Sequence, residues 1–190
     1  MDEQQKLTLI TGGARSGKSR FGETMLMKKG KDILYIATAR TLDREMEERA
    51  KKHQVQRPSN WKTLEAYRDF KSHLPAWKGK VEGVFLDCIT LMVTQLLLDE
   101  CEHPWESMSG HRVDGLENQV HEEIRQLLES LRKLAVPVVI ITNEVGQGIV
   151  PGDKMSRDFR DIAGRVNQKI AAEVDEVYLV VAGIPVKIKE

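Results

Sequence analysis

The sequence predicts an α/β fold with a mostly parallel sheet flanked by helices and a C-terminal antiparallel edge strand. Short apolar runs rich in Val, Ile and Leu alternate with stretches of helical periodicity, as in parallel sheets. A glycine-rich turn follows the first apolar run. No linker-like segment interrupts the 190 residues, so we expect a single domain over residues 1–190.

The apolar runs are near-continuous, as expected for strands covered on both faces. The expected parallel strands are residues 7–10, 33–37, 61–65, 84–86, 138–141 and 177–181. After the last of them, residues 182–185 read Ala-Gly-Ile-Pro and predict a tight turn. Residues 186–188 would then form the antiparallel edge strand, where a preceding proline is tolerated.

Three stretches show helical periodicity besides the helix expected after the glycine-rich turn. The strongest covers residues 116–134, where seven apolar residues share one face: Leu116, Val120, Ile124, Leu127, Leu128, Leu131 and Leu134. Residues 42–52 and 157–173 are the other two. Residues 102–114 contain a proline and a glycine without periodicity, so we expect a surface loop there.

Composition indicates an ordinary soluble protein. Hydrophobic residues make up 41% and charged residues 31%, and the formal net charge is zero, which gives no global attraction to nucleic acid or to anionic membranes. No apolar run approaches the roughly 18 residues needed to span a bilayer. Cys88 and Cys101 lack a metal-binding or redox spacing, so we expect free thiols in the cytoplasm.

The glycine-rich turn matches the P-loop pattern G-x-x-x-x-G-K-[ST]. Its residues are Gly12, Gly13, Ala14, Arg15, Ser16, Gly17, Lys18 and Ser19. Glycines allow successive N–H groups to point at phosphate oxygens, and the following helix adds its positive end. Lys18 would place a charge on the β- and γ-phosphates, and Ser19 would offer a hydroxyl to Mg²⁺. The strand before it and the helix after it support a P-loop NTPase, of the RecA-like type, that binds ATP or GTP.

Asp87 follows the expected strand 84–86 and fits the Walker B carboxylate that supports Mg²⁺ together with Ser19. The alternative is a strand-end aspartate that caps the next helix, a role for which Thr90 competes. Residues 142–146 read Thr-Asn-Glu-Val-Gly and lack the guanine-reading N-K-x-D pattern of GTP switches. Asp87 does not begin a D-x-x-G either. A small-molecule kinase is therefore the expected class.

Five segments in order along the chain resemble one family. They are residues 12–20, 35–38, 142–151, 159–168 and 180–187, and they resemble the bifunctional adenosylcobinamide kinase / adenosylcobinamide-phosphate guanylyltransferase family of cobalamin synthesis. The resemblance implies phosphorylation of adenosylcobinamide by ATP or GTP. It also implies transfer of GMP from GTP to the resulting adenosylcobinamide phosphate. A homo-oligomer, a trimer, is implied as well.

The same resemblance points to a histidine that carries GMP. In the family it lies between L-D-x-E-M-x-x-R and R-P-x-x-W, which correspond here to residues 42–49 and 57–61. The histidine between them is His53, and Lys52 stands where some members have a second histidine. A neutral imidazole can attack the α-phosphorus near neutral pH. Judged by chemistry alone, a histidine at a charged helix end is usually a solvated surface residue.

Further nucleotide contacts carry over from the family by motif: Thr38, Ala39, Arg40, Arg57 and Glu65. Each also has an ordinary interpretation as a turn, cap or surface residue. Asn143, Glu144, Asp161 and Arg165 could bind the corrinoid or the γ-phosphate, or could pack around residues 146–148. The other histidines, His73, His103, His111 and His121, match no family site and are expected at the surface, with His121 on the polar side of its helix.

The two reactions need different phosphorus atoms of the nucleotide. Lys18 suits the γ-phosphate, whereas guanylylation takes place at the α-phosphate. Our hypothesis is that helix 42–52 swings to bring His53 in line with that atom. Two other functions fit the residues: a plain small-molecule kinase without guanylyl transfer, and a nucleotide-sensing module without turnover.

Overall fold

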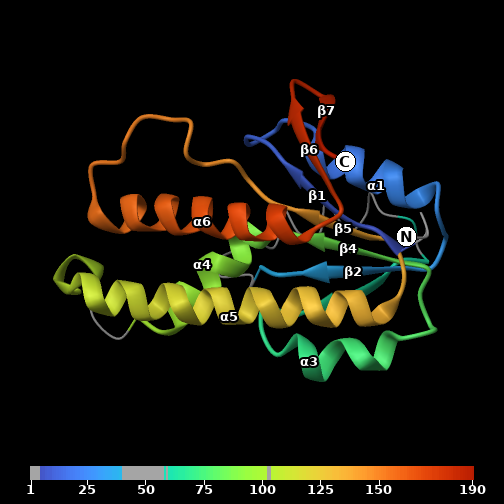
Figure 1. Cartoon of the computed structure of the whole chain (residues 1–190), viewed down its shortest axis with the longest axis horizontal. Helices are drawn as coiled ribbons and strands as arrows, with labels where there is room; N and C mark the ends of the chain where they lie inside the picture. The colour runs from blue at the N-terminus through green and yellow to red at the C-terminus, as the bar shows by residue number, and fades with distance from the viewer. Residues whose placement is uncertain (1–4, 40–57, 59, 102–103) are drawn as a thin grey trace.

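The computed structural model describes residues 5–39, 58, 60–101 and 104–190. Seven strands form one sheet in the order β3-β2-β4-β5-β1-β6-β7. Neighbouring strands are parallel except β6 and β7, which pair antiparallel at the edge. The predicted α/β P-loop fold, with helices on both faces and an antiparallel last strand, is confirmed (Figure 1).

The strands agree closely with the predicted runs. They are β1 Leu7–Thr11, β2 Ile33–Ala37, β3 Lys62–Glu65, β4 Gly83–Asp87, β5 Val138–Ile141, β6 Glu176–Val181 and β7 Ile184–Lys189. A two-residue turn joins β6 to β7, with φ of 51° at Ala182 and 82° at Gly183. Positive φ at both positions is the geometry that matches the twist of a tight hairpin.

The helices lie mainly between the strands along the chain. They are α1 Lys18–Met27, α3 Phe70–His73, α4 Ile89–Asp99, α5 Gly110–Leu134 and α6 Lys154–Glu173, with short 3₁₀ turns at Leu74–Trp77 and Trp105–Ser107. The predicted helix 42–52 lies outside the described residues. Within these ranges no helix is long and apolar enough to cross a bilayer.

The expected surface loop 102–114 is wrong over much of its length. Helix α5 already begins at Gly110, where the Ser109 side chain accepts a hydrogen bond from the Arg112 N–H as an N-cap. Trp105 is buried, and its Nε1–H donates to the Asp158 Oδ2 of α6 at 2.8 Å. The first turns of α5 carry few apolar residues, so their periodicity was too weak to predict a helix.

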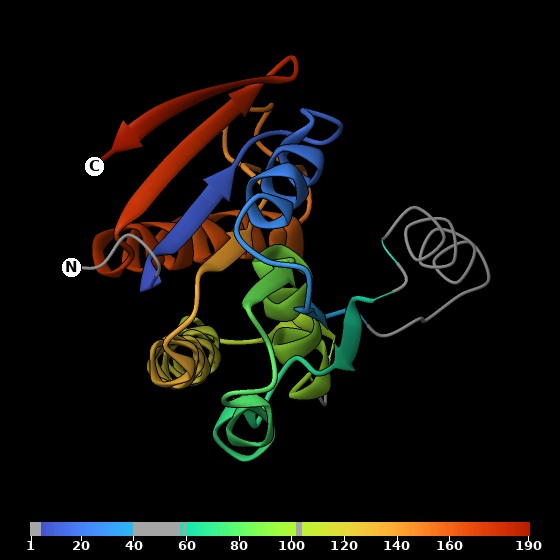
Figure 2. The same ribbon diagram turned by 90° about the vertical axis from the view of Figure 1, so that its right-hand side faces the viewer.

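The two faces of the sheet are covered unequally. Helix α1 packs on one face over a small cluster that includes Ile10, Phe85 and Ile141. Helices α3, α4, α5 and α6 pack over the other face in a much larger cluster. Figure 2 shows α1 and α5 on opposite sides of the sheet. The predicted apolar face of α5 lies entirely within the larger cluster.

Candidate active site

The P-loop connects β1 to α1 at the carboxyl edge of the sheet. Gly12 is fixed by close packing, because a Cβ there would lie 2.5 Å from the Val180 carbonyl oxygen and 2.8 Å from Ser16 Oγ. Gly17 has φ of 94° and precedes the first residue of α1, a conformation that side chains disfavour. Arg15 also has a positive φ, 60°. Both matched glycines therefore have steric reasons for being glycine.

The β6–β7 turn supports the P-loop from the side. The Gly183 N–H donates to the Ser16 carbonyl at 2.8 Å, and a Cβ on Gly17 would lie 3.2 Å from Gly183 Cα. Sequence reasoning identified Gly183 only as a turn residue. No local signal reports this contact, because it joins segments far apart in the chain.

Lys18, the first residue of α1, is buried inside the loop, and its Nζ donates to the Gly13 carbonyl at 3.1 Å. Burial lowers the pKa of Lys18, whereas the charges of Asp87 and, to a lesser extent, Cys88 act in the opposite direction. Ser16 Oγ is buried and has no hydrogen-bond partner among the described residues. A buried hydroxyl of this kind calls for a partner, and a bound phosphate would supply one.

Asp87 ends β4 and approaches the P-loop helix. Ser19 Oγ donates to Asp87 Oδ2 at 3.3 Å, so the two predicted Mg²⁺ residues lie together although they are 68 positions apart. Cys88 occupies the N-cap position of α4, and its side chain makes no capping hydrogen bond. Neither Asp87 nor Thr90 therefore acts as the cap that the alternative interpretation required. Hard oxygen donors at this spacing fit Mg²⁺, which takes few protein ligands.

The remaining predicted contacts follow β2 and β3. The Thr38 side chain is fully buried, and its hydroxyl donates to the Cys88 carbonyl at 2.7 Å and accepts from the Cys88 N–H at 2.9 Å. Ala39 is half-buried, and Glu65 is exposed at the end of β3, paired with Ala37 of β2. Arg40, His53 and Arg57 lie outside the described residues.

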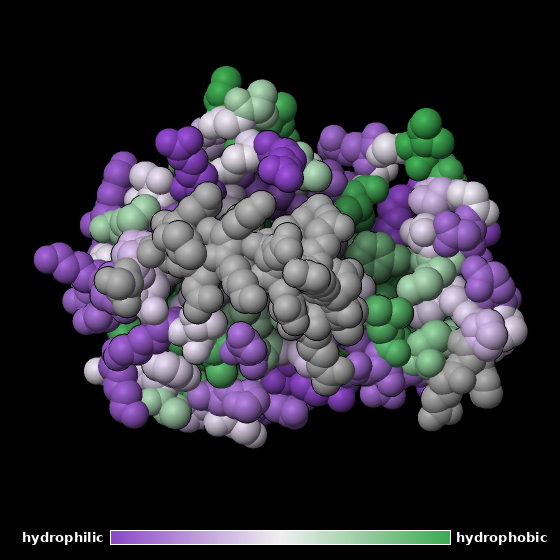
Figure 3. Space-filling view, turned by 180° about the vertical axis from the view of Figure 1, so that it is seen from behind, coloured by the Kyte–Doolittle hydropathy of each residue, from purple (hydrophilic) through white to green (hydrophobic). Residues whose placement is uncertain are grey.

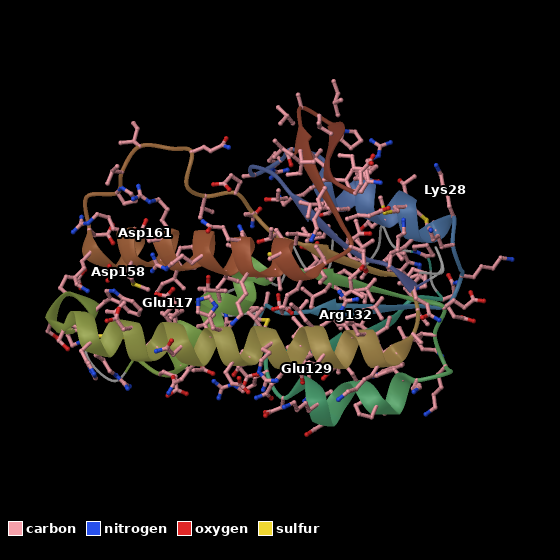
Figure 4. The ribbon with its side chains drawn as sticks, viewed as in Figure 1. Lys28, Glu117, Glu129, Arg132, Asp158 and Asp161 are labelled. Carbon is pink, nitrogen blue, oxygen red and sulfur yellow. The ribbon has the colours of Figure 1, made fainter. Side chains whose placement is uncertain are left out.

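Two of the candidates for binding the corrinoid or the γ-phosphate take part in surface ion pairs. Arg165 of α6 donates from Nε and Nη2 to Glu117 of α5 at 2.5 and 2.7 Å. Asp161 accepts from the neighbouring Arg160 at 3.1 Å. Figure 4 shows Glu117 between the two long helices, with Asp158 and Asp161 along α6. His121, predicted on the polar side, is only 21% exposed and lies 3.3 Å from Glu117.

Sequence reasoning missed a polar network behind the carboxyl edge. It consists of Thr90, Thr142 and Asn167, which join α4, the end of β5 and α6 through side-chain hydrogen bonds. A polar pair following a buried strand, Thr142-Asn143, was a weak signal for it. The partners Thr90 and Asn167 come from helices whose packing no local pattern gives.

Comparisons with known proteins give matches over nearly the whole chain. The family model for cobinamide kinase / cobinamide phosphate guanyltransferase matches residues 8–188. The bifunctional adenosylcobalamin biosynthesis proteins CobU of Salmonella typhimurium and of Escherichia coli are each 43% identical over 187 residues, covering 96% of this chain and 99% of theirs. The corresponding CobP of Pseudomonas aeruginosa is 38% identical over 181 residues, covering 95% of this chain and 96% of its own.

Among solved structures, a KaiC-like protein from Pyrococcus horikoshii is 15% identical with a TM-score of 0.46, covering 93% of this chain and 71% of that one. The family assignment rests on the sequence matches, which extend over nearly the whole chain and include the P-loop. On these matches the chain belongs to the cobinamide kinase / cobinamide phosphate guanyltransferase family.

Proposed function

We propose that this chain phosphorylates the aminopropanol hydroxyl of adenosylcobinamide with ATP or GTP, and then transfers GMP from GTP to that phosphate. The products of the second step are adenosylcobinamide-GDP and pyrophosphate, within cobalamin biosynthesis. The observation that carries the proposal is the P-loop, with Lys18 bonded inside the loop and Ser19 bonded to Asp87, in a chain that belongs to this family.

Phosphate binding uses the whole loop from Gly12 to Ser19. The helix α1 begins at Lys18 and directs its positive end toward the loop. Ser16 Oγ and the backbone N–H groups would donate to phosphate oxygens, and Lys18 would exchange the Gly13 carbonyl for the β- and γ-phosphates. Ser19 and Asp87 would hold Mg²⁺, which neutralises charge on the phosphates when bound.

His53 is the proposed carrier of GMP. Its imidazole nitrogen attacks the α-phosphorus of GTP, a P–N bond forms, and the bond to the β-phosphate oxygen breaks as pyrophosphate leaves. An oxygen of adenosylcobinamide phosphate then attacks the same phosphorus and releases the imidazole. The further proposed nucleotide contacts are Thr38, Ala39, Arg40, Arg57 and Glu65. Hydrogen bonds to the Cys88 backbone hold Thr38 in place.

Self-association, as a homotrimer, is also proposed. It is supported by four apolar residues at the sheet edge that are half exposed or more: Val181, Ile184, Val186 and Ile188. Apolar patches on a soluble protein commonly mark contact surfaces. Figure 3 shows hydrophobic groups exposed at the tip of the hairpin. Cys88 and Cys101 are thiols that do not form a disulfide, which supports a reducing cytoplasmic location.

The test is covalent labelling with Mg²⁺ and GTP carrying radioactivity on the α-phosphate. We expect an acid-labile, alkali-stable label on the wild type that is lost in His53→Ala and kept in the matched control His73→Ala. Lys18→Ala should lose the label because it binds the phosphates poorly. A wild type that binds GTP but takes no label would contradict the histidine intermediate. It would favour a plain kinase if adenosylcobinamide is phosphorylated, and a nucleotide sensor if it is not.

A further inference from the structure

A chain of buried hydrogen bonds lies behind the phosphate site. Thr142, directly after β5, is 1% exposed, and its Oγ1 donates to Asn167 Oδ1 of α6 at 2.7 Å. Thr90 in the first turn of α4 is 8% exposed, with its Oγ1 3.4 Å from Thr142 Oγ1. Buried polar groups are costly unless satisfied, so a network joining three elements fixes its members firmly.

The residue that this network holds is Asn143. Its backbone N–H donates to Thr90 Oγ1 at 2.7 Å, and its carbonyl accepts from Asn167 Nδ2 at 3.2 Å. The next N–H, of Glu144, donates to the Gly12 carbonyl at 3.1 Å. The backbone of Asn143 is therefore tied to α4, to α6 and to the start of the P-loop.

Strand alternation places the Asn143 side chain on the P-loop side of the sheet. Val139 and Ile141 of β5 belong to the cluster beneath α1, and side chains two residues apart along a strand share a face. Asn143 Nδ2 lies 3.9 Å from Cys88 Sγ. Cys88 directly follows Asp87, which accepts from Ser19. The carboxamide thus lies against the residue that follows Asp87, the proposed Mg²⁺ ligand.

The carboxamide has only a weak partner there. The Nδ2–Sγ separation of 3.9 Å is long, and Cys88 is buried. A thiol sulfur is only a weak hydrogen-bond acceptor. Within the part of the chain that the structure describes, no other side-chain bond of Asn143 is recorded. Its amide N–H groups and its Oδ1 are therefore available to a ligand.

We propose that Asn143 contacts the γ-phosphoryl group during the kinase step, donating a hydrogen bond from Nδ2 to a γ-phosphoryl oxygen, and that Thr90, Thr142 and Asn167 position it. This rests on the proposed function. In that step the acceptor hydroxyl oxygen bonds to the γ-phosphorus and its proton is released to solvent. The bond from the γ-phosphorus to the bridging oxygen breaks, and the nucleoside diphosphate leaves. Asn143 moves no proton. It stabilises charge on the oxygens of the group in transfer, at a position fixed before the reaction.

The first experiment compares Asn143→Ala with wild type and with Asn118→Ala, an exposed asparagine of α5. We expect Asn143→Ala to lower kcat for phosphorylation of adenosylcobinamide by about 100-fold, the usual cost of losing one preorganised donor. Affinity for a non-hydrolysable ATP analogue should stay close to that of wild type. Asn143→Asp should be at least as impaired, because it places an acceptor against phosphate. An unchanged kcat in Asn143→Ala, or a loss explained entirely by weaker nucleotide binding, overturns the proposal.

A second experiment tests the positioning role of Asn167. The Asn167→Asp variant keeps the oxygen that accepts from Thr142 and removes the donor to the Asn143 carbonyl. We expect a lower kcat at nearly unchanged KM, and no further loss when it is combined with Asn143→Ala, since Asn167 acts through Asn143. Additive losses in the double variant would refute this route.

The same variants separate this inference from the proposed GMP carrier. The label on His53 depends on the α-phosphate, so Asn143→Ala should still take up GMP. If the wild type takes up no label, the His53 step is contradicted, while the phosphorylation measurements remain valid. Equal phosphorylation by wild type and Asn143→Ala would contradict only the role of Asn143.

Discussion

The two faces of the sheet differ in what they contribute: one carries the nucleotide-binding residues, and the other most of the hydrophobic core. The α1 face has a small apolar cluster, with Lys18, Ser19 and Asp87 at its carboxyl edge. The α5 face has most of the buried apolar side chains. Of the predicted site residues it carries Asp161 and Arg165 of α6, which form surface ion pairs. The face covered only by α1 leaves the backbone of the P-loop accessible to a nucleotide. Burial of apolar side chains on the α5 face supplies most of the free energy that holds the strand ends in place.

The largest effect that the comparison predicts is on activity alone. Lys18→Ala removes the charge that faces the β- and γ-phosphates, so kcat/KM for phosphorylation should fall by about 100- to 1,000-fold. The free energy of unfolding should stay the same or rise, because Lys18 is a buried cation. Kinetics and urea titration measure the two quantities.

Lys28→Ala is the matched control, since Lys28 is exposed at the far end of α1 (Figure 4). A large loss of stability in Lys18→Ala would contradict this separation of activity from stability, because the P-loop would then be part of the structural core.

The next effect falls on stability alone. Leu127 of α5 is fully buried, so Leu127→Ala should lower the free energy of unfolding by about 2–5 kcal/mol through lost burial and a residual cavity. Met27→Ala at the end of α1 is the control: Met27 is 48% exposed, and its loss should change stability by less than about 0.5 kcal/mol.

Urea unfolding monitored by circular dichroism measures both variants. The kcat of folded Leu127→Ala should equal that of wild type at low temperature. A fall in kcat without unfolding would show that the α5 face transmits changes to the P-loop.

The smallest effect is electrostatic and lies between α5 and α6. The Arg165 guanidinium is the main reason that the pKa of Glu117 lies below its usual 4.5. A lowered carboxyl pKa stabilises the fold at pH above the unfolded value, and that contribution is lost as pH falls through the folded value. Because Arg165 is half exposed, the coupling should be only roughly 0.2–1 kcal/mol.

A double-mutant cycle of Glu117→Gln and Arg165→Ala, with urea unfolding at neutral pH and at about pH 3, measures this coupling. It should be largest at neutral pH and decrease as the pH falls through the folded pKa of Glu117. A coupling that persists in acid would show that packing of the long side chains, rather than charge, joins the helices.

The sequence alone determined the local parts of this protein. Periodicity and the types of neighbouring residues predict four features: the strand runs, the apolar face of α5, the tight β6–β7 turn and the P-loop. Each of them can be predicted from one short segment of the sequence. The pairing of Ser19 with Asp87 was also predictable, because a P-loop requires a carboxylate on a neighbouring strand and Asp87 ends a buried one. The first turns of α5 were missed because Gly110 and its polar neighbours carry little periodic signal.

Only the tertiary structure decided which distant groups meet. The Gly183 turn supports the Ser16 carbonyl, the Thr38 hydroxyl binds the backbone of Cys88, and Asn167 holds the backbone of Asn143. Each contact joins residues that are 24 or more positions apart, and the geometry that brings them together is set by strand order and helix packing. Hydrogen bonds of this kind depend on distances of a few tenths of an ångström, which residue types and spacing do not specify.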